Sequence, residues 1–290
     1  MDSAGSPPEN RHSLNRRGFI KLTAAAGALA AVYPVEFSRH NLEVTQHKIL
    51  LPKLADEFRG MKIVQISDLH FEEYDEAFFL EHVIHVVNGL KPDLVLYTGD
   101  IVSYGPFPKS FGRSRVAPCA EILAKTQCPW RFASLGNHDY VVGWEHVKDG
   151  LESHGIPTLV NRAVPLERGG KRLWLVGLGS ACAMASHPET AIPKSALRDG
   201  DAVVVMAHEP DVLPQIASYG VDLMLSGHTH GGQIRFPLVP PMFLPTLGRI
   251  YIEGMFRMGN THLYVNRGIG AVLVPVRLNC RPEITEFTLV

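Results

Sequence analysis

The sequence predicts an α/β fold, and three features indicate it. Five short apolar runs are typical of buried strands, at residues 62–66, 93–97, 130–134, 202–206 and 222–225. Residues 77–90 carry apolar side chains at helical spacing and end before Pro92, as expected for a helix that connects parallel strands. Each of the five runs is followed directly by a cluster of polar side chains, which is where α/β folds place their sites.

Further elements follow from the same patterns along the chain. Residues 37–51 alternate loosely and end at Pro52, which predicts an edge strand ahead of the core. Three more helices are predicted at residues 145–154, 195–198 and 212–218. Residues 173–178, 263–266 and 284–290 are predicted to form strands of a second sheet. Periodicity alone establishes the α/β class and no finer architecture.

The polar clusters that follow the five runs consist almost entirely of Asp, Asn and His. They supply seven candidate metal ligands, Asp68, His70, Asp100, Asn137, His208, His228 and His230. Because the carboxyl ends of neighbouring strands open onto one crevice, we expect these side chains to converge. Carboxylate and amide oxygens with imidazole nitrogens suit manganese, iron or zinc. Seven ligands are about right for two divalent ions that share one carboxylate.

Each cluster also has a structural interpretation. Asp68 and His70 could belong to a turn or a helix N-cap, and residues 136–139 could form a tight turn. The segment 227–232 could be a glycine-rich hairpin with two surface histidines. The metal site is the better interpretation because all five clusters occur in the same position, directly after a strand.

The order of these clusters and the residues within them resemble those of the calcineurin-like metallophosphoesterase family, and the resemblance extends from residue 42 to the C-terminus. The resemblance rests on Ser67-Asp-Leu-His70, Leu135-Gly-Asn-His-Asp-Tyr140, His208-Glu-Pro-Asp211 and residues 225–233, Leu-Ser-Gly-His-Thr-His-Gly-Gly-Gln. It implies a four-layer α/β/β/α sandwich of two mixed sheets flanked by helices. It also implies that Asp68, His70 and His230 hold one metal, that Asn137, His208 and His228 hold the other, and that Asp100 bridges them.

The resemblance further implies that His138 is the catalytic acid, with manganese as the expected metal and iron or zinc as alternatives. Two cations lower the pKa of a shared water and clamp phosphate oxygens, so phosphoryl transfer needs little beyond placement and charge neutralisation. His138 can face the leaving oxygen and donate a proton, and Asp139 could orient its ring. The sequence departs from many relatives at Ser103 and Ser180, where they carry acidic residues.

The N-terminal segment 1–34 resembles a bacterial twin-arginine export signal. Arg16 and Arg17 precede a mildly apolar, alanine-rich stretch of about 12 residues, which is shorter than the roughly 20 that a spanning helix needs. Small residues around Ala30 offer a cleavage site. We expect recognition by the twin-arginine export machinery and location in the periplasm or cell envelope, with a catalytic domain at 35–290. The alternative is a basic N-terminus of a cytoplasmic enzyme.

Composition limits the partners and leaves the cysteines undecided. The formal net charge is −1, and no block of Lys or Arg lies beyond the N-terminus, so nucleic acid is not expected as a partner. The four cysteines, Cys119, Cys128, Cys182 and Cys280, show no zinc-site spacing, and their redox state is left open.

The segment Phe236–Leu247 is apolar, rich in proline and directly follows the last metal motif. It cannot form a regular helix or a central strand. One interpretation is a loop packed over the core. The other is a hydrophobic lip that contacts a membrane, a lipid or an acyl chain next to the metals. Arg235, Arg277 and Arg281 are further candidates, for contact with a substrate phosphate.

These observations predict a dinuclear-metal hydrolase of a phosphodiester or pyrophosphate bond. The substrate is a phosphorylated small molecule or a lipid-linked compound, and within the resembled family the chain is similar to envelope enzymes such as UDP-2,3-diacylglucosamine pyrophosphatase. One alternative is a soluble phosphomonoesterase or nucleotide phosphodiesterase. Another is a metal-binding scaffold without turnover, against which the complete ligand set and His138 argue.

Overall fold

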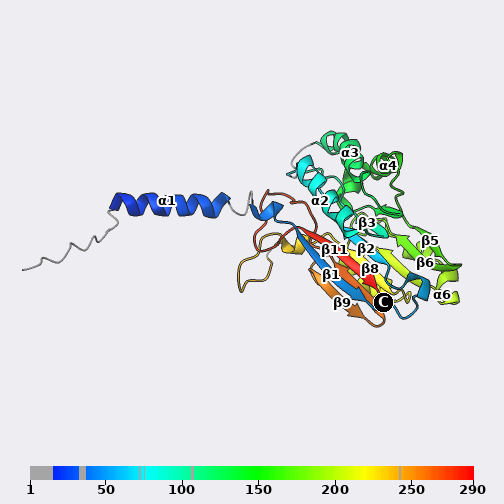
Figure 1. Ribbon diagram of the computed structural model, residues 1–290. Coiled ribbons are helices and arrows are strands. Elements are labelled where there is room, and N and C mark those ends of the chain that lie inside the picture. Colours follow the sequence, from blue (N-terminus) through cyan, green and yellow to red (C-terminus); the bar gives the residue numbers. More distant parts are fainter. Residues whose placement is uncertain (1–15, 33–36, 72, 75, 106–107, 242) are drawn as a thin grey trace, which may run out of the picture.

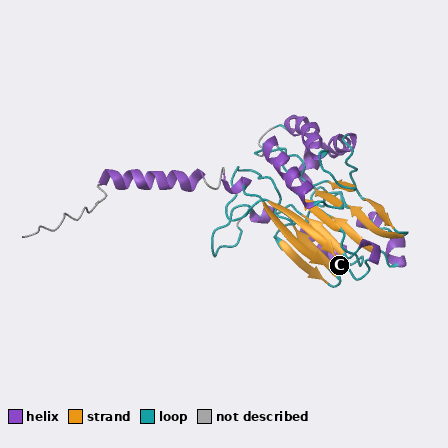
Figure 2. Cartoon of the chain, viewed as in Figure 1, coloured by secondary structure: helices purple, strands orange, loops and turns teal. Residues whose placement is uncertain are grey.

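The computed structural model contains two stacked β-sheets with helices on both outer faces (Figures 1 and 2). It describes residues 16–32, 37–71, 73–74, 76–105, 108–241 and 243–290. The two stacked sheets and the helices outside them confirm the predicted four-layer α/β/β/α arrangement, and both sheets are mixed. The helices are α1 (Arg16–Val32), α2 (Ala77–Leu90), α3 (Lys109–Leu123), α4 (Asn137–Ser153), α5 (Pro188–Ala191), α6 (Lys194–Asp199) and α7 (Leu213–Ala217). Short 3₁₀ turns lie at Ser38–His40, Asp56–Phe58, Pro210–Val212 and His230–Gly232.

The first sheet has the strand order β1-β11-β2-β3-β4. Its strands are β1 (Glu43–Ile49), β2 (Lys62–Ile66), β3 (Leu94–Thr98), β4 (Trp130–Ser134) and β11 (Glu283–Leu289). β2, β3 and β4 run parallel, whereas β11 is antiparallel to β2 and parallel to β1. The predicted edge strand is thus confirmed as β1, and α2 is confirmed as the helix between β2 and β3.

The second sheet has the order β5-β6-β7-β8-β10-β9. Its strands are β5 (Arg162–Arg168), β6 (Lys171–Gly177), β7 (Ala202–Met206), β8 (Leu223–Ser226), β9 (Gly254–Met258) and β10 (Thr261–Val265). The strands β6, β7, β8 and β10 are parallel to one another, and the hairpin partners β5 and β9 close the two edges.

Three clusters of buried apolar side chains hold the sheets and helices together. Between the sheets, Ile63 of β2 and Leu96 of β3 pack against Leu175 of β6 and Val204 of β7. On the outer face of the first sheet, side chains such as Val64 pack against α2, α3 and α4, and a third cluster joins the second sheet to α5, α6 and α7. Because β2 buries side chains on both faces, its apolar residues Ile63, Val64 and Ile66 do not alternate with exposed polar ones.

One strand assignment was wrong. Residues 284–290 were predicted to join the second sheet, but β11 lies in the first sheet, hydrogen-bonded between β1 and β2. Its side chains alternate between the core that joins the two sheets, where Phe287 lies, and the core beneath the helices, where Ile284 lies. Periodicity identifies a strand, but the choice of neighbour depends on which strand edge the rest of the fold leaves open.

Half of the predicted N-terminal signal lies outside the described residues. Of the expected signal at 1–34, the structure describes residues 16–32, which form α1. Among the described helices, none combines the length and the apolar character required to cross a membrane.

Candidate metal centre

The predicted ligands lie on loops that leave the ends of both sheets at one place. Asp68 and His70 follow β2, Asp100 follows β3, and Asn137 opens α4 after β4. From the second sheet, His208 follows β7, and His228 with His230 follow β8. The loops are tied together by backbone hydrogen bonds, among them Asp68 N to Gly99 O at 3.0 Å. The close stacking of the two sheets therefore gathers side chains that are up to about 160 residues apart in sequence.

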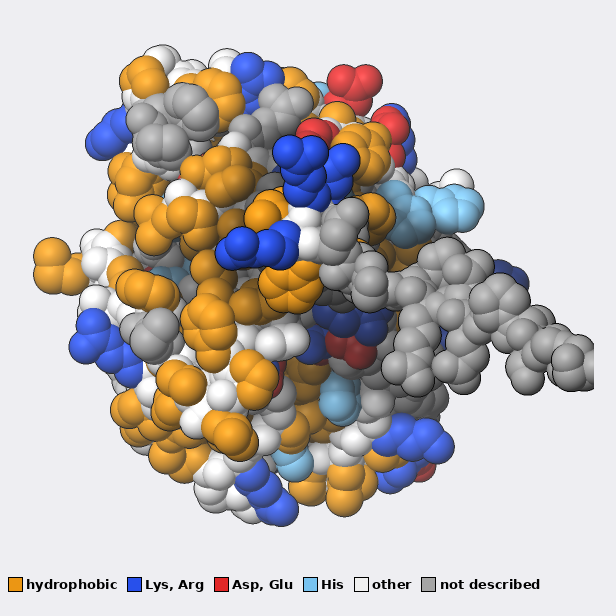
Figure 3. All heavy atoms as spheres, turned by 90° about the vertical axis from the view of Figure 1, so that its left-hand side faces the viewer, with side chains coloured by type: hydrophobic (Ala, Val, Ile, Leu, Met, Phe, Trp, Pro, Cys, Tyr) orange, Lys and Arg blue, Asp and Glu red, His pale blue; other side chains and the backbone are white. Residues whose placement is uncertain are grey.

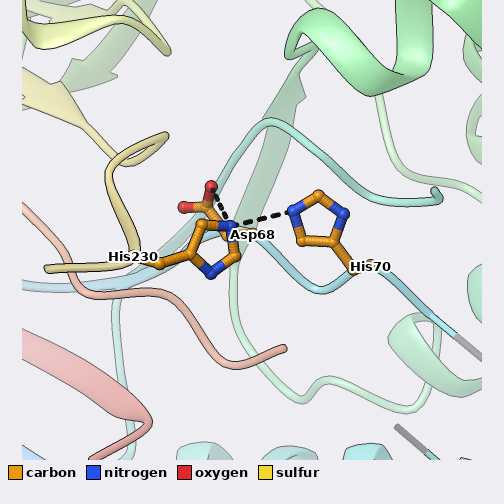
Figure 4. Close-up of side chains that lie close together, drawn as sticks. All are labelled: Asp68, His70 and His230. Atoms are coloured by element: carbon orange, nitrogen blue, oxygen red, sulfur yellow. Dashed lines mark hydrogen bonds and ion pairs between the residues drawn. The ribbon is translucent and has the colours of Figure 1, made fainter. Parts of the chain in front are cut away.

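The first ligand group consists of Asp68, His70 and His230 (Figure 4). The Nε2 atoms of His70 and His230 lie 3.0 Å apart, and His230 Nε2 is 3.5 Å from Asp68 Oδ1. All three side chains are buried. Two imidazole nitrogens and a carboxylate oxygen that are buried and face one another suit a cation among them.

The second group consists of Asp100, His208 and His228. His208 Nε2 lies 3.1 Å from Asp100 Oδ2, while its Nδ1 lies 2.8 Å from Thr98 O. His228 Nε2 lies 2.7 Å from Thr246 O. A ring nitrogen that donates to a backbone carbonyl leaves the other nitrogen as a metal ligand, so these contacts select Nε2 of His208 and Nδ1 of His228.

Asp100 lies between the two groups. Its Oδ2 is 3.1 Å from His208 Nε2 and 3.6 Å from His70 Nε2, and its Oδ1 accepts a hydrogen bond from His138 N at 2.8 Å. Next to it, Asn137 Oδ1 is buried and has no hydrogen-bond partner within the described part of the chain. A buried oxygen left without a donor costs free energy, and a bound cation would remove that cost.

The backbone at the predicted ligands is strained. Positive φ angles occur at Asp68 (51°), His70 (45°), Asp100 (51°), His228 (73°) and His230 (50°). Each such non-glycine residue costs on the order of 1 kcal/mol or more, and such strain concentrates at functional sites. The fold accepts this cost at five of the seven predicted ligands, where it turns their side chains inward.

Two glycines of the motifs give the ligands their space. A Cβ at Gly227 would overlap Asp68 Oδ2 and Ser67 Oγ, and a Cβ at Gly136 would overlap Asp100 Oδ1. These glycines are therefore required by close approach to the ligands, in addition to any role in turns.

The charge states of the buried groups suit a cation. Burial lowers the pKa values of His70 and His230 well below the usual range, and neighbouring cationic groups lower them further, so both rings are neutral and offer a lone pair. Burial opposes ionisation of Asp100, but His208 and His138 hold its pKa well below the usual value. Burial likewise opposes the charged form of His208, yet Asp100 raises its pKa well above the ordinary one.

These observations test whether the residues fit a pair of divalent ions, and they do. Imidazole nitrogens, carboxylate oxygens and an amide oxygen form two groups with Asp100 between them. No cysteine belongs to either group among the described residues, and all four cysteines are free thiols. The donor set suits manganese, iron or zinc, and it does not choose among them.

His138 lies at the edge of this site with its ring held on three sides. The ring stacks on Tyr104 at 4.5 Å and meets the edge of His70 at 4.5 Å. Its Nδ1 lies 3.1 Å from Ser103 Oγ, which also contacts Glu73. Ser103 entered the sequence analysis only as a departure from relatives, and Glu73 did not enter it. A signal for Glu73 was available in its spacing three residues after His70.

Asp139 does not orient the ring of His138, contrary to the prediction. Its carboxylate accepts hydrogen bonds from the backbone N–H groups of Gly136 at 2.9 Å, Ile101 at 3.0 Å and Val102 at 3.1 Å. Asp139 is the third residue of α4, so it caps the helix and ties the loop after Asp100 to it. Burial and the charge of Asp100 raise the pKa of Asp139 to about 7.

The three candidate arginines do not line the cavity beside the metal centre. Arg277 is fully buried behind His230 and donates to the carbonyls of Arg267 and Gly270. Arg235 pairs with Glu253, and Arg281 donates to Asn41. These contacts hold loops together.

A cavity of 690 Å³ opens beside the metal centre. One side carries Asp100, Asn137, His138, His228 and His230. The other side is apolar and is formed by Phe243, Leu244 and Pro245 from one loop and by Val272, Leu273 and Val274 from another. Val272 N donates to Gln233 Oε1 and Gln233 Nε2 donates to Val272 O, so the second loop is tied to the segment that precedes the first.

Comparison with known proteins gives matches over most of the chain. A family model described as calcineurin-like phosphoesterase matches residues 61–232. The metallophosphoesterase YkuE of Bacillus subtilis is 35% identical over 95% of this chain and 98% of its own length. The phosphodiesterase YaeI of Escherichia coli is 34% identical over 96% of this chain and 100% of its own. A transmembrane protein with a metallophosphoesterase domain from Danio rerio is 30% identical over 90% of this chain and 60% of its own.

Proposed function

Since the chain belongs to the calcineurin-like phosphoesterase family, we propose that it is a dinuclear-metal hydrolase of a phosphodiester or pyrophosphate bond. Asp68, His70 and His230 hold one divalent cation, and Asn137, His208 and His228 hold the other. Asp100 bridges the two. The single observation that carries this proposal is the position of the Asp100 carboxylate between two groups of buried, inward-facing ligands.

The residues around the centre divide the work of hydrolysis. When bound, two such cations lower the pKa of an attacking water and neutralise charge on the phosphoryl oxygens. Asp100 keeps its negative charge because His208 and His138 lower its pKa, so it can serve both cation positions. His138 lies beside Asn137 at the cavity and donates a proton from Nε2 to the leaving oxygen.

Turnover of a substrate panel tests the reaction. The full chain is loaded in turn with manganese, iron and zinc and assayed on aryl diesters, pyrophosphates and aryl monoesters. We expect hydrolysis of diesters or pyrophosphates with manganese and weaker monoester hydrolysis. Monoester hydrolysis that exceeds the others would favour a phosphomonoesterase. Two bound ions without turnover of any substrate would identify a scaffold and refute the hydrolase proposal.

The apolar wall of the cavity supports a lipid-linked substrate. Large apolar side chains of the wall and of the adjoining loop are exposed to solvent, namely Phe236, Leu238, Val239, Phe243, Leu273 and Val274. Figure 3 shows hydrophobic side chains gathered around a hollow on this side of the molecule. Residues 236–247 and 271–276 contain no charged side chain. A contiguous exposed apolar surface beside a site for phosphate chemistry favours a substrate that carries both an acyl chain and a phosphate.

The same surface supports peripheral contact with a membrane, consistent with export to the periplasm or cell envelope by the twin-arginine machinery. Phe243 and Leu273 are 72% and 76% exposed and line the cavity mouth, so a bilayer that covers them would deliver a lipid substrate directly to the metal centre. The export proposal itself rests on the paired Arg16 and Arg17 at the start of α1.

The lipid proposal is tested with a double variant, Phe243→Ser with Leu273→Ser. We expect kcat/KM on a diacylated pyrophosphate substrate to fall on the order of tenfold or more, because part of the burial of two large side chains is lost. Hydrolysis of a small aryl diester should change less than about twofold. Leu50→Ser is the matched control, since Leu50 is 59% exposed at the other end of the first sheet. Equal losses on both substrates would refute the lipid contact.

A further inference from the structure

We propose that Ser103 and Glu73 form a positioning pair that fixes the orientation and the tautomer of His138. The inference rests on the proposed function, in which His138 protonates the leaving oxygen. Neither residue is a candidate ligand of the two cations in that proposal. Both are buried, at 3% and 6% exposure, and they lie on separate loops after β3 and β2.

The contacts of Ser103 define the pair. Its hydroxyl donates to Glu73 Oε2. Ser103 Oγ also accepts a hydrogen bond from the backbone N–H of Gly105 at 3.1 Å, and it lies 3.1 Å from His138 Nδ1. A hydroxyl has one proton to donate and two lone pairs to accept with. The proton is used on Glu73 and one lone pair on Gly105, so the remaining lone pair accepts from His138.

It follows that Nδ1 of His138 carries a proton. Ser103 Oγ donates its one proton to Glu73, so toward the ring it can only accept. Nε2 is then the nitrogen that exchanges its proton. When the N–H bond at Nε2 breaks, its electron pair stays on the ring, the proton forms an O–H bond with the leaving group, and the neutral ring keeps Nδ1–H.

Neighbouring groups hold the pair and the ring in place. Glu73 Oε1 accepts a hydrogen bond from Leu273 N at 3.0 Å, so both carboxylate oxygens are engaged. Tyr104 stacks on the His138 ring with an interplanar angle of 26°, which fixes the ring plane. This arrangement satisfies the need of a general acid for a fixed hydrogen-bond direction. It also connects the acid to the apolar wall of the cavity through Leu273.

A competing interpretation is that Glu73 is a metal ligand. His70, Glu73 and His138 form a third group whose ligand atoms lie within 4.8 Å of one another. The positioning pair is favoured because both oxygens of Glu73 already have donors. Metal content decides between the two, since loss of a ligand would release an ion and loss of a positioning residue would not.

The kinetic test uses the full chain and two diesters that differ only in the leaving phenol, 4-nitrophenol or phenol. Phenol is the more basic leaving group and needs protonation more. In Ser103→Ala we expect kcat on the phenyl ester to fall at least about tenfold more than kcat on the nitrophenyl ester, with KM within about twofold. Glu73→Gln should act in the same direction, and Ser103→Thr should restore most of the rate. Both ions should remain.

Ser180→Ala is the matched control. Ser180 also donates to a buried carboxylate, that of Glu209, but the described contacts of this pair do not include His138. Any change that Ser180→Ala makes in kcat should be equal on the two esters. If Ser103→Ala lowers both esters equally, or if Glu73→Gln releases an ion, the positioning pair is refuted.

A spectroscopic readout separates this inference from the proposed function. Long-range ¹H–¹⁵N correlation spectra of zinc-loaded protein distinguish the two tautomers of a neutral histidine. We expect His138 to carry its proton on Nδ1 in the natural chain and to lose this preference in Ser103→Ala. A neutral ring protonated at Nε2 in the natural chain would overturn the inference, whatever the activity. Absence of turnover in the natural chain would count against the proposed function alone.

Discussion

Replacement of Asp100 by Asn tests the centre most directly, because it removes a charge and keeps the shape. Asp100 Oδ2 lies 3.1 Å from one predicted ligand nitrogen, on His208, and 3.6 Å from another, on His70. Two unit charges about 3 Å apart interact by on the order of 5 kcal/mol at an effective dielectric constant of about 20. After relaxation and entry of water, we expect about 3 kcal/mol of binding free energy to be lost, which is on the order of 100-fold in dissociation constant.

The assay is metal content after equilibration at a fixed free concentration of manganese or zinc, followed by isothermal titration. The natural chain should hold two ions, and Asp100→Asn should hold one ion or fewer and lose at least about 100-fold in kcat. Asp222→Asn is the control, because Asp222 is a buried carboxylate that accepts Val203 N at 2.9 Å and pairs with Lys53 away from the centre. Two ions bound by Asp100→Asn with unchanged affinity would refute the bridging role.

Three further outcomes follow from the structure. His138→Ala should keep both ions while kcat falls about 10²- to 10⁴-fold, and loss of metal would instead make His138 a ligand. Asp139→Ala should lower the free energy of unfolding in urea by about 3 kcal/mol, because three buried N–H donors lose their acceptor; a loss below about 1 kcal/mol would contradict the capping role. Metal affinity should rise with pH through and above the ordinary titration range of histidine, on the order of tenfold per unit for each proton released, because Asp100 raises the pKa of His208 and the bound ion requires its neutral ring. A pH-independent affinity in titration calorimetry would contradict that assignment.

The strands before the polar clusters were predictable because burial on both faces leaves a direct trace in the sequence. β2, β3, β7 and β8 are buried along almost their whole length and consist mostly of apolar residues, and each is followed by a predicted ligand. The helix predicted at residues 145–154 begins earlier, at Asn137. Gly143, with a φ of 126°, breaks the helical backbone inside α4, and the predicted helix corresponds to the part after this break.

The partners of individual side chains were less predictable. Adjacency in sequence suggested that Asp139 orients His138, but successive residues of a helix point in different directions. The Asp139 carboxylate therefore turns back to the N-terminus of α4, and the ring of His138 meets Ser103 from the loop after β3. A contact between loops leaves no local pattern in the sequence.

By itself, the sequence determined which residue types follow which strands, and hence the family, the α/β class and the ligand candidates, because backbone periodicity and ligand chemistry are local properties. The tertiary structure decided how those residues meet. It placed β11 between β1 and β2, placed Asp100 between the two ligand groups, gave His138 a serine and a glutamate as neighbours, and placed residues of the loops at 236–247 and 271–276 on the wall of one cavity. These are distances between segments far apart in the chain, and they are fixed by the packing of two sheets and their helices, which no short stretch of sequence encodes.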